Sequence, residues 1–242
     1  MGKTLISQRR GKGTGVFKAR SHRYVGRLCF RKYDESEKSG VINGTLINLV
    51  HCPGHSAPLA EIKYNNKEKI LVSAPLGVEL GSFVSSGAKA DIKVGNVLPL
   101  NMIPDGAAVC LIESAPGSGP IFCNASGASA KIISKNDNKI IVELQSKKQR
   151  TFNGNCRAMI GVIAGGGRLD KPIVKAGNRA LAMRARNKYY PQSKGVAMNA
   201  VAHPFGSGRG RRIGKSKTPS RFDPPGRRVG LIGARRTGRK KK

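Results

Sequence analysis

Positive charge is concentrated at the two ends of this 242-residue chain, which limits what those ends can fold into. Residues 1–33 contain ten Lys or Arg and no acid, whereas residues 173–242 contain twenty and one acid, Asp223. The two arms carry +29 of the formal net charge of +32, so the middle carries only +3. Because like charges repel and the arms have little apolar surface to bury, we expect them to order only on an anionic partner.

Nucleic acid is the anion that fits these arms. Each neutralised phosphate releases condensed counterions, which gives a strong, salt-sensitive affinity. An anionic membrane also attracts polybasic segments, but no long amphipathic face, lipidation motif, leader or membrane-spanning apolar run accompanies them. We therefore expect an intracellular, cytoplasmic protein without a membrane partner.

The middle of the chain is predicted to be mainly β. Short β-rich runs alternate with Gly, Pro and Asn, and such spacing is typical of small barrels. The expected strands are 41–50 with an interruption at Asn43-Gly44, 59–64, 70–74, 97–100, 107–113, 130–133, 140–144 and 158–164. The second and third should form a hairpin around Asn65-Asn66-Lys67, and the boundary between two barrels is expected within 85–96.

Only one segment is predicted to be helical. Residues 175–188 contain four Ala residues, Leu181 and Met183, and the segment stops before Pro191. Their cations spread around the helix axis, which disfavours burial and suits a phosphate channel.

The basic side chains, together with His22, are the predicted RNA contacts. In the N-terminal arm they alternate with Gly and with Phe17, Tyr24 and Phe30, which could stack on unpaired bases, although a merely solvated tail is the alternative. The predicted contacts are Arg9, Arg10, Lys12, Arg20, His22, Arg23, Arg27, Arg31, Arg168, Lys171, Lys175, Arg179, Arg184, Arg186, Lys188, Arg209, Arg211, Arg212, Lys215, Arg227, Arg228, Arg235, Arg236 and Arg239.

Two short motifs have competing interpretations. The three glycines 165–167 before Arg168 could expose amides to a phosphate or could be a flexible hinge, and the sequence does not decide between them. His51, Cys52 and His55 could bind a metal, but no fourth ligand is close in sequence, so a Pro-Gly turn is preferred. The five widely spaced cysteines are expected to be free thiols. No cofactor and no protein metal site is predicted, and any Mg²⁺ would belong to the RNA.

Four sequence blocks together resemble a known family. They are Gly95–Leu100 (GNVLPL), Ala164–Pro172 (AGGGRLDKP), Gly195–Gly208 (GVAMNAVAHPFGSG) and Val229–Arg239 (VGLIGARRTGR). In this order they resemble the universal second protein of the large ribosomal subunit, the L-two family, over essentially the whole chain. The last block, and the chain from Gly117 onward, are closer to eukaryotic or archaeal members than to bacterial ones.

The resemblance implies a domain order and a function. It implies a basic RNA-binding arm at 1–33, an oligonucleotide-binding-type barrel at 34–93, an SH3-like barrel at 94–172 and a basic extension at 173–242. The extension would carry a loop inserted into RNA, with Met198, Asn199 and His203 as contacts. The implied function is a structural constituent of the large subunit that organises ribosomal RNA. Its loop would support the peptidyl transferase region and subunit association, beside neighbouring ribosomal proteins and the small subunit.

Departures from the family pattern limit what the loop can do. The family usually has Pro after the loop Asn and an acid before the His, where this chain has Ala200 and Ala202. Without that acid, the imidazole of His203 lacks the partner that would orient it or raise its pKa. Cys52 and His55 replace Asp and Arg, which removes an ion pair that the family would have.

Two other classes of protein remain to be weighed. A DNA-packaging protein would bind duplexes by charge alone, but it would need neither Gly-rich barrels nor a weakly charged loop at 195–208. An enzyme would use Cys156 or His203, yet the loop has no nucleophile or carboxylate beside the histidine. The sequence therefore predicts a structural RNA-binding protein and no catalytic residue.

Overall fold

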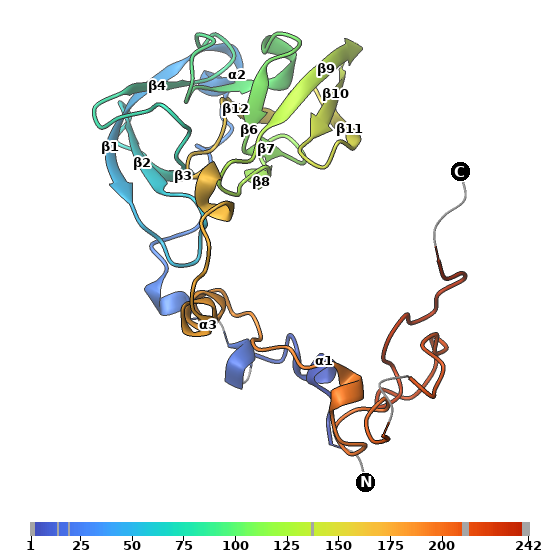
Figure 1. The fold of residues 1–242 in the computed structure, drawn as a ribbon. Coiled ribbons are helices and arrows are strands. Elements are labelled where there is room, and N and C mark those ends of the chain that lie inside the picture. The colour runs from blue at the N-terminus through green and yellow to red at the C-terminus, as the bar shows by residue number, and fades with distance from the viewer. Residues whose placement is uncertain (1–2, 14, 19, 137, 210–212, 239–242) are drawn as a thin grey trace. The chain divides into compact units, whose positions relative to one another are not determined.

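The chain folds into two compact units (Figure 1). The computed structural model describes residues 1–242 except 1–2, 14, 19, 137, 210–212 and 239–242. We call Ser21–Pro172 the sheet unit, and Met1–Arg20 together with Ile173–Lys242 the arm unit. Within the described ranges, no helix has the length and apolar character needed to cross a bilayer.

The sheet unit contains the β-strands. They are β1 (Ile42–Val50), β2 (Leu59–Tyr64), β3 (Lys69–Ser73), β4 (Phe83–Ser86), β5 (Val97–Pro99), β6 (Ala108–Cys110), β7 (Ile112–Glu113), β8 (Pro120–Phe122), β9 (Ala130–Asn136), β10 (Lys139–Leu144), β11 (Gln149–Asn153) and β12 (Arg157–Ile160). The unit also holds the helix α2 (Glu35–Ser39) and 3₁₀ turns at Ser21–Arg23, Leu100–Met102 and Gly166–Leu169.

Most of these strands join in one sheet. Its order is β11-β10-β9-β6-β12-β5-β4-β1-β2-β3, and β7 pairs separately with β8. Neighbours are antiparallel except β4 and β5, which meet in parallel at Ser86 and Val97. The expected hairpin is confirmed: β2 pairs with β3 from Leu59↔Ser73 to Lys63↔Lys69.

The adjacent strands β6, β12 and β5 contribute side chains to both hydrophobic cores and separate them. Successive strand residues point to opposite faces. In β12, Met159 therefore packs into the first core while Ala158 and Ile160 pack into the second. Strand β5 divides in the same way, with Val97 in the first core and Leu98 in the second. The strands shared by both cores explain why the two halves form one unit.

The prediction of a mainly β fold is confirmed, while the closure of two barrels and their boundaries at 34–93 and 94–172 stay predictions. Strands β4, β8 and β11 were not predicted. Each is short, and β11 (QRTFN) has Phe152 as its one apolar residue, so it lacks the alternation of apolar and polar residues that indicates a strand. The expected strand 107–113 is interrupted because Leu111 adopts a left-handed φ of 53°.

The arm unit contains little regular structure. Its helices are α1 (Ile6–Arg9) and α3 (Ala176–Ala185), with 3₁₀ turns at Gly15–Phe17 and Gly195–Ala197. Helix α3 is shorter than the predicted 175–188 because Asn187 turns left-handed (φ 56°), and the amide of Lys188 bonds back to the carbonyl of Met183 at 2.8 Å. None of the residues of α3 is buried, as its evenly distributed cations predict.

Candidate nucleic-acid interface

The cations predicted to contact RNA are mostly exposed where the structure describes them. Arg211, Arg212 and Arg239 lie outside the described residues. Arg20, Met198 and His203 are half-buried. The exposed ones are Arg9, Arg10, Lys12, His22, Arg23, Arg27, Arg168, Lys171, Lys175, Arg179, Arg184, Arg186, Lys188, Asn199, Arg209, Lys215, Arg227, Arg228, Arg235 and Arg236. Their exposure is compatible with phosphate contact, and the contacts themselves stay predictions.

Arg31 does not fit the expected RNA contact. Its side chain is only 4% exposed. Its guanidinium forms an ion pair with Asp34 and lies 3.3 Å from carboxylate oxygens of both Glu37 and Glu68. Because these carboxylates already neutralise it in the interior, a phosphate cannot reach it without dismantling the fold. We reassign Arg31 to the structure of the sheet unit.

A second buried arginine, Arg157, completes this charge network. Its Nη1 donates to Oε2 of Glu37 at 2.9 Å and to the carbonyl of Arg31 at 2.7 Å, while its Nη2 donates to Oε1 of Glu113 at 2.7 Å. Burial alone would lower the pKa of Arg157, but the bonds to Glu113 and the charge of Glu37 outweigh it and raise the pKa. The guanidinium also lies 5.3 Å from the ring centre of Phe30.

This network is fixed from several segments. Glu37 lies in α2, whose N-cap Asp34 accepts a hydrogen bond from the amide of Glu37 at 3.1 Å. Glu113 lies at the end of β7 and also accepts from the amides of Gly117 and Gly119. The network therefore connects the N-terminal segment, α2, β7 and β12. Sequence patterns did not reveal it, because Glu113 and Arg157 are far from Arg31 and Glu37 in the chain.

The aromatic residues of the N-terminal arm are less available than predicted. Phe30 is 7% exposed and packs in the first core, so it offers no free stacking face. Phe17 is buried against Tyr189, with ring centres 6.1 Å apart and planes inclined by 27°. Tyr189 and its neighbour Tyr190 line cavities of the arm unit, although no sequence pattern singled them out.

The loop 195–208 folds back on itself through backbone hydrogen bonds. The amides of Ala202 and His203 both donate to the carbonyl of Asn199, at 2.9 and 3.1 Å, and the amide of Ser207 donates to the carbonyl of Met198 at 3.1 Å. A Cβ on Gly206 would lie 2.4 Å from that same Met198 oxygen, so this position requires glycine. The loop is a defined structure and not a plain tether.

The imidazole of His203 is held in one orientation inside this loop. Its Nδ1 accepts the backbone N–H of Phe205 at 3.0 Å, so the proton of the neutral ring lies on Nε2. The ring lies directly over Gly195, where an added Cβ would be 2.3 Å from Cε1. Burial lowers the pKa of His203 below its usual value, which keeps the ring neutral at pH 7. The ring is a fixed hydrogen-bond donor and not a phosphate-binding cation.

A second loop of the C-terminal arm closes in a similar manner. The amide of Leu231 donates to the carbonyl of Lys217 at 2.7 Å, and the amide of Gly233 donates to the carbonyl of Pro219 at 3.0 Å. Asp223, the single acid of this arm, accepts the amide of Ser220 at 2.8 Å. The acid therefore shapes the loop, and the cations of this segment remain largely uncompensated.

The glycines 165–167 form a packed turn and not a flexible hinge. The backbones of Gly127 and Gly166 approach so closely that a Cβ on Gly127 would lie 2.5 Å from the Cα of Gly166. Gly165 has a left-handed φ of 79°, and Arg168 donates from Nε to Ser126 Oγ at 3.1 Å. Packing against the turn at Gly127 accounts for Gly166, and the left-handed backbone accounts for Gly165, while a phosphate contact at this turn stays a prediction.

The Cys52–His55 segment forms a turn. The amide of His55 donates to the carbonyl of Cys52 at 3.1 Å, as the Pro-Gly signal predicts. The Nδ1 of His55 also lies 3.1 Å from Sγ of Cys52. No cluster of three or more His, Cys, Asp or Glu side chains suited to a metal ion occurs within the described residues.

The candidate nucleophile Cys156 is unsuited to catalysis. Its side chain is fully buried, and burial raises the pKa of the thiol, so it stays protonated. A polyanion-binding protein with a structural role accounts for the arrangement, since most of the described cations face solvent, while Cys156 is buried and the Nδ1 of His203 is taken up by the amide of Phe205.

Comparison with known proteins gives the family. Residues 2–86 match the RNA binding N-terminal domain of Ribosomal Proteins L2, and residues 93–223 match the C-terminal domain of the same proteins. The chain belongs to the ribosomal protein L2 family, and it is a structural RNA-binding protein and not an enzyme.

Several archaeal proteins resemble the chain over its full length. The large ribosomal subunit protein uL2 of Methanococcus maripaludis is 47% identical over 240 residues, covering 99% of this chain and 100% of the relative. The protein of the same name from Methanothermobacter thermautotrophicus is 45% identical over 241 residues, covering 100% of both. That of Natronomonas pharaonis is 46% identical over 239 residues, covering 99% and 97%. The predicted archaeal-type membership is confirmed.

Proposed function

We propose that the loop 195–208 supports the peptidyl transferase region and the association of the two ribosomal subunits. The chain itself is a structural constituent of the large ribosomal subunit in the cytoplasm, where it binds ribosomal RNA. The proposal adds that the loop acts near the peptidyl transferase region, beside neighbouring ribosomal proteins and the small subunit.

The observation that carries the proposal is the fixed geometry of a weakly charged loop between strongly cationic segments. Residues 195–208 contain no Lys or Arg, whereas Lys194 and Arg209 flank them directly. The flanking cations attract RNA, and the loop presents Nε2–H of His203 and apolar surface in a defined arrangement. Such an element positions RNA groups and does not simply neutralise them.

The arms would offset the repulsion between RNA segments that pack together. At an effective dielectric constant near 20, two phosphates about 6 Å apart repel by roughly 3 kcal/mol. A guanidinium placed between them reverses that repulsion locally, and its planar fork can bridge two strands. Mg²⁺ bound to the RNA would share this role, without protein ligands.

A test of the proposal compares loop variants in assembled ribosomes. Large subunits carrying His203→Ala should sediment normally, since the anchoring cations are intact, but should join small subunits less completely and form peptide bonds more slowly. The matched control Lys194→Ala removes an exposed cation beside the loop and leaves the loop geometry in place. Normal subunit joining and normal peptide-bond formation with His203→Ala would contradict the proposal.

A further inference from the structure

We propose that the arm unit binds one unpaired stretch of ribosomal RNA in a row of four adjoining cavities. The inference rests on the proposed function and names the form of RNA that the arms receive. We name each cavity by a residue that lines it. Cavity 1, beside Tyr190, has a volume of about 330 Å³, and cavity 2, beside Phe17, about 570 Å³. Cavity 3, beside His203, has about 310 Å³, and cavity 4, beside Phe205, about 510 Å³. All of their lining residues belong to the arm unit.

The cavities form a series because neighbours share lining residues. Lys188 lines cavities 1 and 2, and Arg10, Tyr189 and Gln192 line both cavities 2 and 3. Val229 lines both cavities 3 and 4. Neighbouring cavities therefore adjoin, and successive nucleotides of one polymer could each occupy one, whereas a free small molecule would gain nothing from the series.

Each cavity combines an aromatic ring with at least two cations. Tyr190 lies with Arg20 and Arg184 in cavity 1, and Phe205 lies with Lys215 and Arg227 in cavity 4. Cavities 2 and 3 have Tyr189 with Arg10, joined by Lys188 and by Arg228 respectively. No acidic side chain is among the described residues that line the four cavities. Rings for base stacking beside cations for phosphates are what single-stranded nucleic acid needs.

The size of the cavities favours single nucleotides over a duplex. Their volumes lie at the lower end of the range for ligand pockets, roughly 300–1,000 Å³. A base can enter such a space only when it is unstacked and unpaired, because the edges of a paired base point into the helix. The occupant is therefore a single strand with bases turned into the protein.

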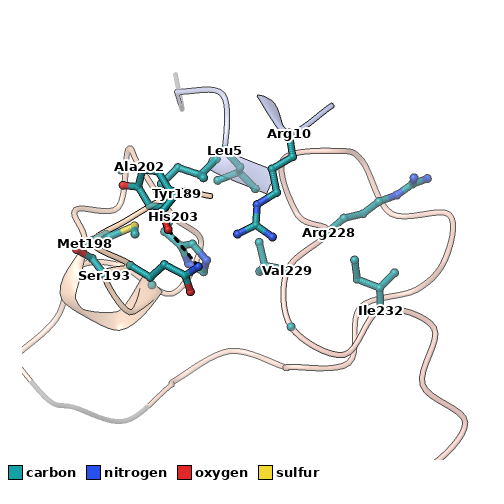
Figure 2. Close-up of a pocket in the computed structure, with 14 residues that line it drawn as sticks. Leu5, Arg10, Tyr189, Ser193, Met198, Ala202, His203, Arg228, Val229 and Ile232 are labelled. Atoms are coloured by element: carbon teal, nitrogen blue, oxygen red, sulfur yellow. Dashed lines mark hydrogen bonds between the residues drawn. The ribbon is translucent and has the colours of Figure 1, made fainter. Parts of the chain in front are cut away.

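Tyr189 is the central element of the row. It lies in the wall between cavities 2 and 3, and the ring of Phe17 supports it from within the arm unit. Figure 2 shows the guanidinium of Arg10 directed into cavity 3, in the space among Tyr189, His203 and Val229. Since Nδ1 of His203 is engaged by Phe205, its Nε2–H is the group left to bind a base or a sugar hydroxyl. Arg10 provides the charge, and His203 provides a neutral donor.

The test measures binding of an oligoadenylate decamer to the full chain. Tyr189→Ala removes a stacking ring and no charge, so affinity for the decamer should fall by about 5- to 150-fold. The slope of affinity against salt should not change, because the phosphate contacts remain. Tyr189→Phe should bind like the unchanged protein, since the ring is retained.

A matched control lies in the same arm. Phe222 is 89% exposed and lines none of the four cavities, so Phe222→Ala should bind the decamer like the unchanged protein. An RNA hairpin of the same length should bind more weakly and should not distinguish Tyr189→Ala from the unchanged protein. A second readout uses a decamer in which single adenosines are replaced by 4-thiouridine. The photocrosslinks from these nucleotides to the protein are then mapped and should include Tyr189.

Several results would overturn the inference. These are equal decamer binding by Tyr189→Ala and the unchanged protein, an equal loss with Phe222→Ala, or crosslinks outside the row. Adenosine monophosphate or oligoglutamate competing as well as the decamer would assign the row to a free nucleotide or an acidic peptide. If the unchanged protein still binds ribosomal RNA in these cases, the proposed function survives, and absence of all ribosomal RNA binding would refute both.

Discussion

The guanidinium of Arg157 lies 2.9 Å from a carboxylate oxygen of Glu37, a residue 120 positions earlier in the chain. Both side chains are almost fully buried, at 3% and 1% exposure. Glu37 belongs to α2 and Arg157 to β12, so the pair ties the N-terminal part of the sheet unit to its last strand. Glu113 and Arg31 complete the neutralisation, because isolated charges in an interior are strongly unfavourable.

Replacing Arg157 by Ala should destabilise the sheet unit severely. The change leaves Glu37 and Glu113 buried without their shared cation, which costs about 3–5 kcal/mol of the free energy of unfolding. Urea unfolding of the RNA-free protein, followed by circular dichroism, measures the loss. The matched control is Lys93→Ala, which removes an exposed partner of Asp91 and should cost at most about 1 kcal/mol. Equal losses for the two variants would contradict the structural role of the network.

Gly206→Ala should disrupt the loop that holds His203. The new methyl group would lie 2.4 Å from the carbonyl oxygen of Met198 and 2.5 Å from that of Asn199, and backbone atoms cannot easily move aside. Gly214→Ala is the control, because no atom lies within 4 Å of its added Cβ. Resonances of the His203 imidazole should shift or broaden in the first variant only. An unchanged spectrum of Gly206→Ala would show that the loop does not close as described.

The imidazole of His203 should titrate below its usual pKa of 6.5, because burial disfavours the charged ring. Since the unfolded chain then takes up the proton first, the contribution of this residue to stability is full above about pH 6.5 and declines as the pH falls below it. A pH series of nuclear magnetic resonance spectra measures the midpoint. A midpoint of His203 above 6.5 would contradict the buried, neutral donor.

Removing residues 209–242 should weaken RNA binding and flatten its dependence on salt. Because roughly ten phosphates would no longer be neutralised, the slope of log affinity against log salt should become less steep by about 7 to 9. Filter binding to ribosomal RNA over a series of salt concentrations measures this slope. An unchanged slope would mean that the C-terminal arm does not contact phosphates.

Amide exchange should separate the body from the arms in RNA-free protein. Protection is expected mainly within residues 41–165, where the strands pair and the cores are buried, and it should spread into the arms when ribosomal RNA is added. Without RNA, the loops of residues 173–242 are closed by only a few backbone hydrogen bonds, so they should exchange faster than the paired strands. Protection of these residues as strong as that of the strands would contradict the ordering of the arms on their partner.

Local patterns predicted much of the fold, and long-range contacts account for most of what was missed. Strands β1, β3, β9 and β10 contain several β-branched residues, and β2 is mostly apolar with Ile62 and Tyr64, so their positions followed from the sequence. Strand β4 is four residues long and adjoins a turn, and its pairing with β1 supplies the order that its own sequence lacks. Pairing is decided by distant segments, which a local pattern does not contain.

The candidate site was predictable in its charge and not in its geometry. Clustered cations were enough to expect a polyanion, because charge needs no precise placement to act. Arg31 looked like the other arm cations, and only the folded structure places Asp34, Glu37 and Glu68 around it. The same limit applies to Tyr189, since its neighbours in the row of cavities come from opposite ends of the chain.

The most direct test of the account is crosslinking in cells, followed by mapping of the RNA attached to this chain. The account predicts crosslinks to large-subunit ribosomal RNA that concentrate in the described parts of residues 3–27 and 168–238, with few in the interior of the sheet unit. Crosslinks spread over unrelated RNA or DNA, or ribosomal RNA attached only through the sheet unit, would contradict it.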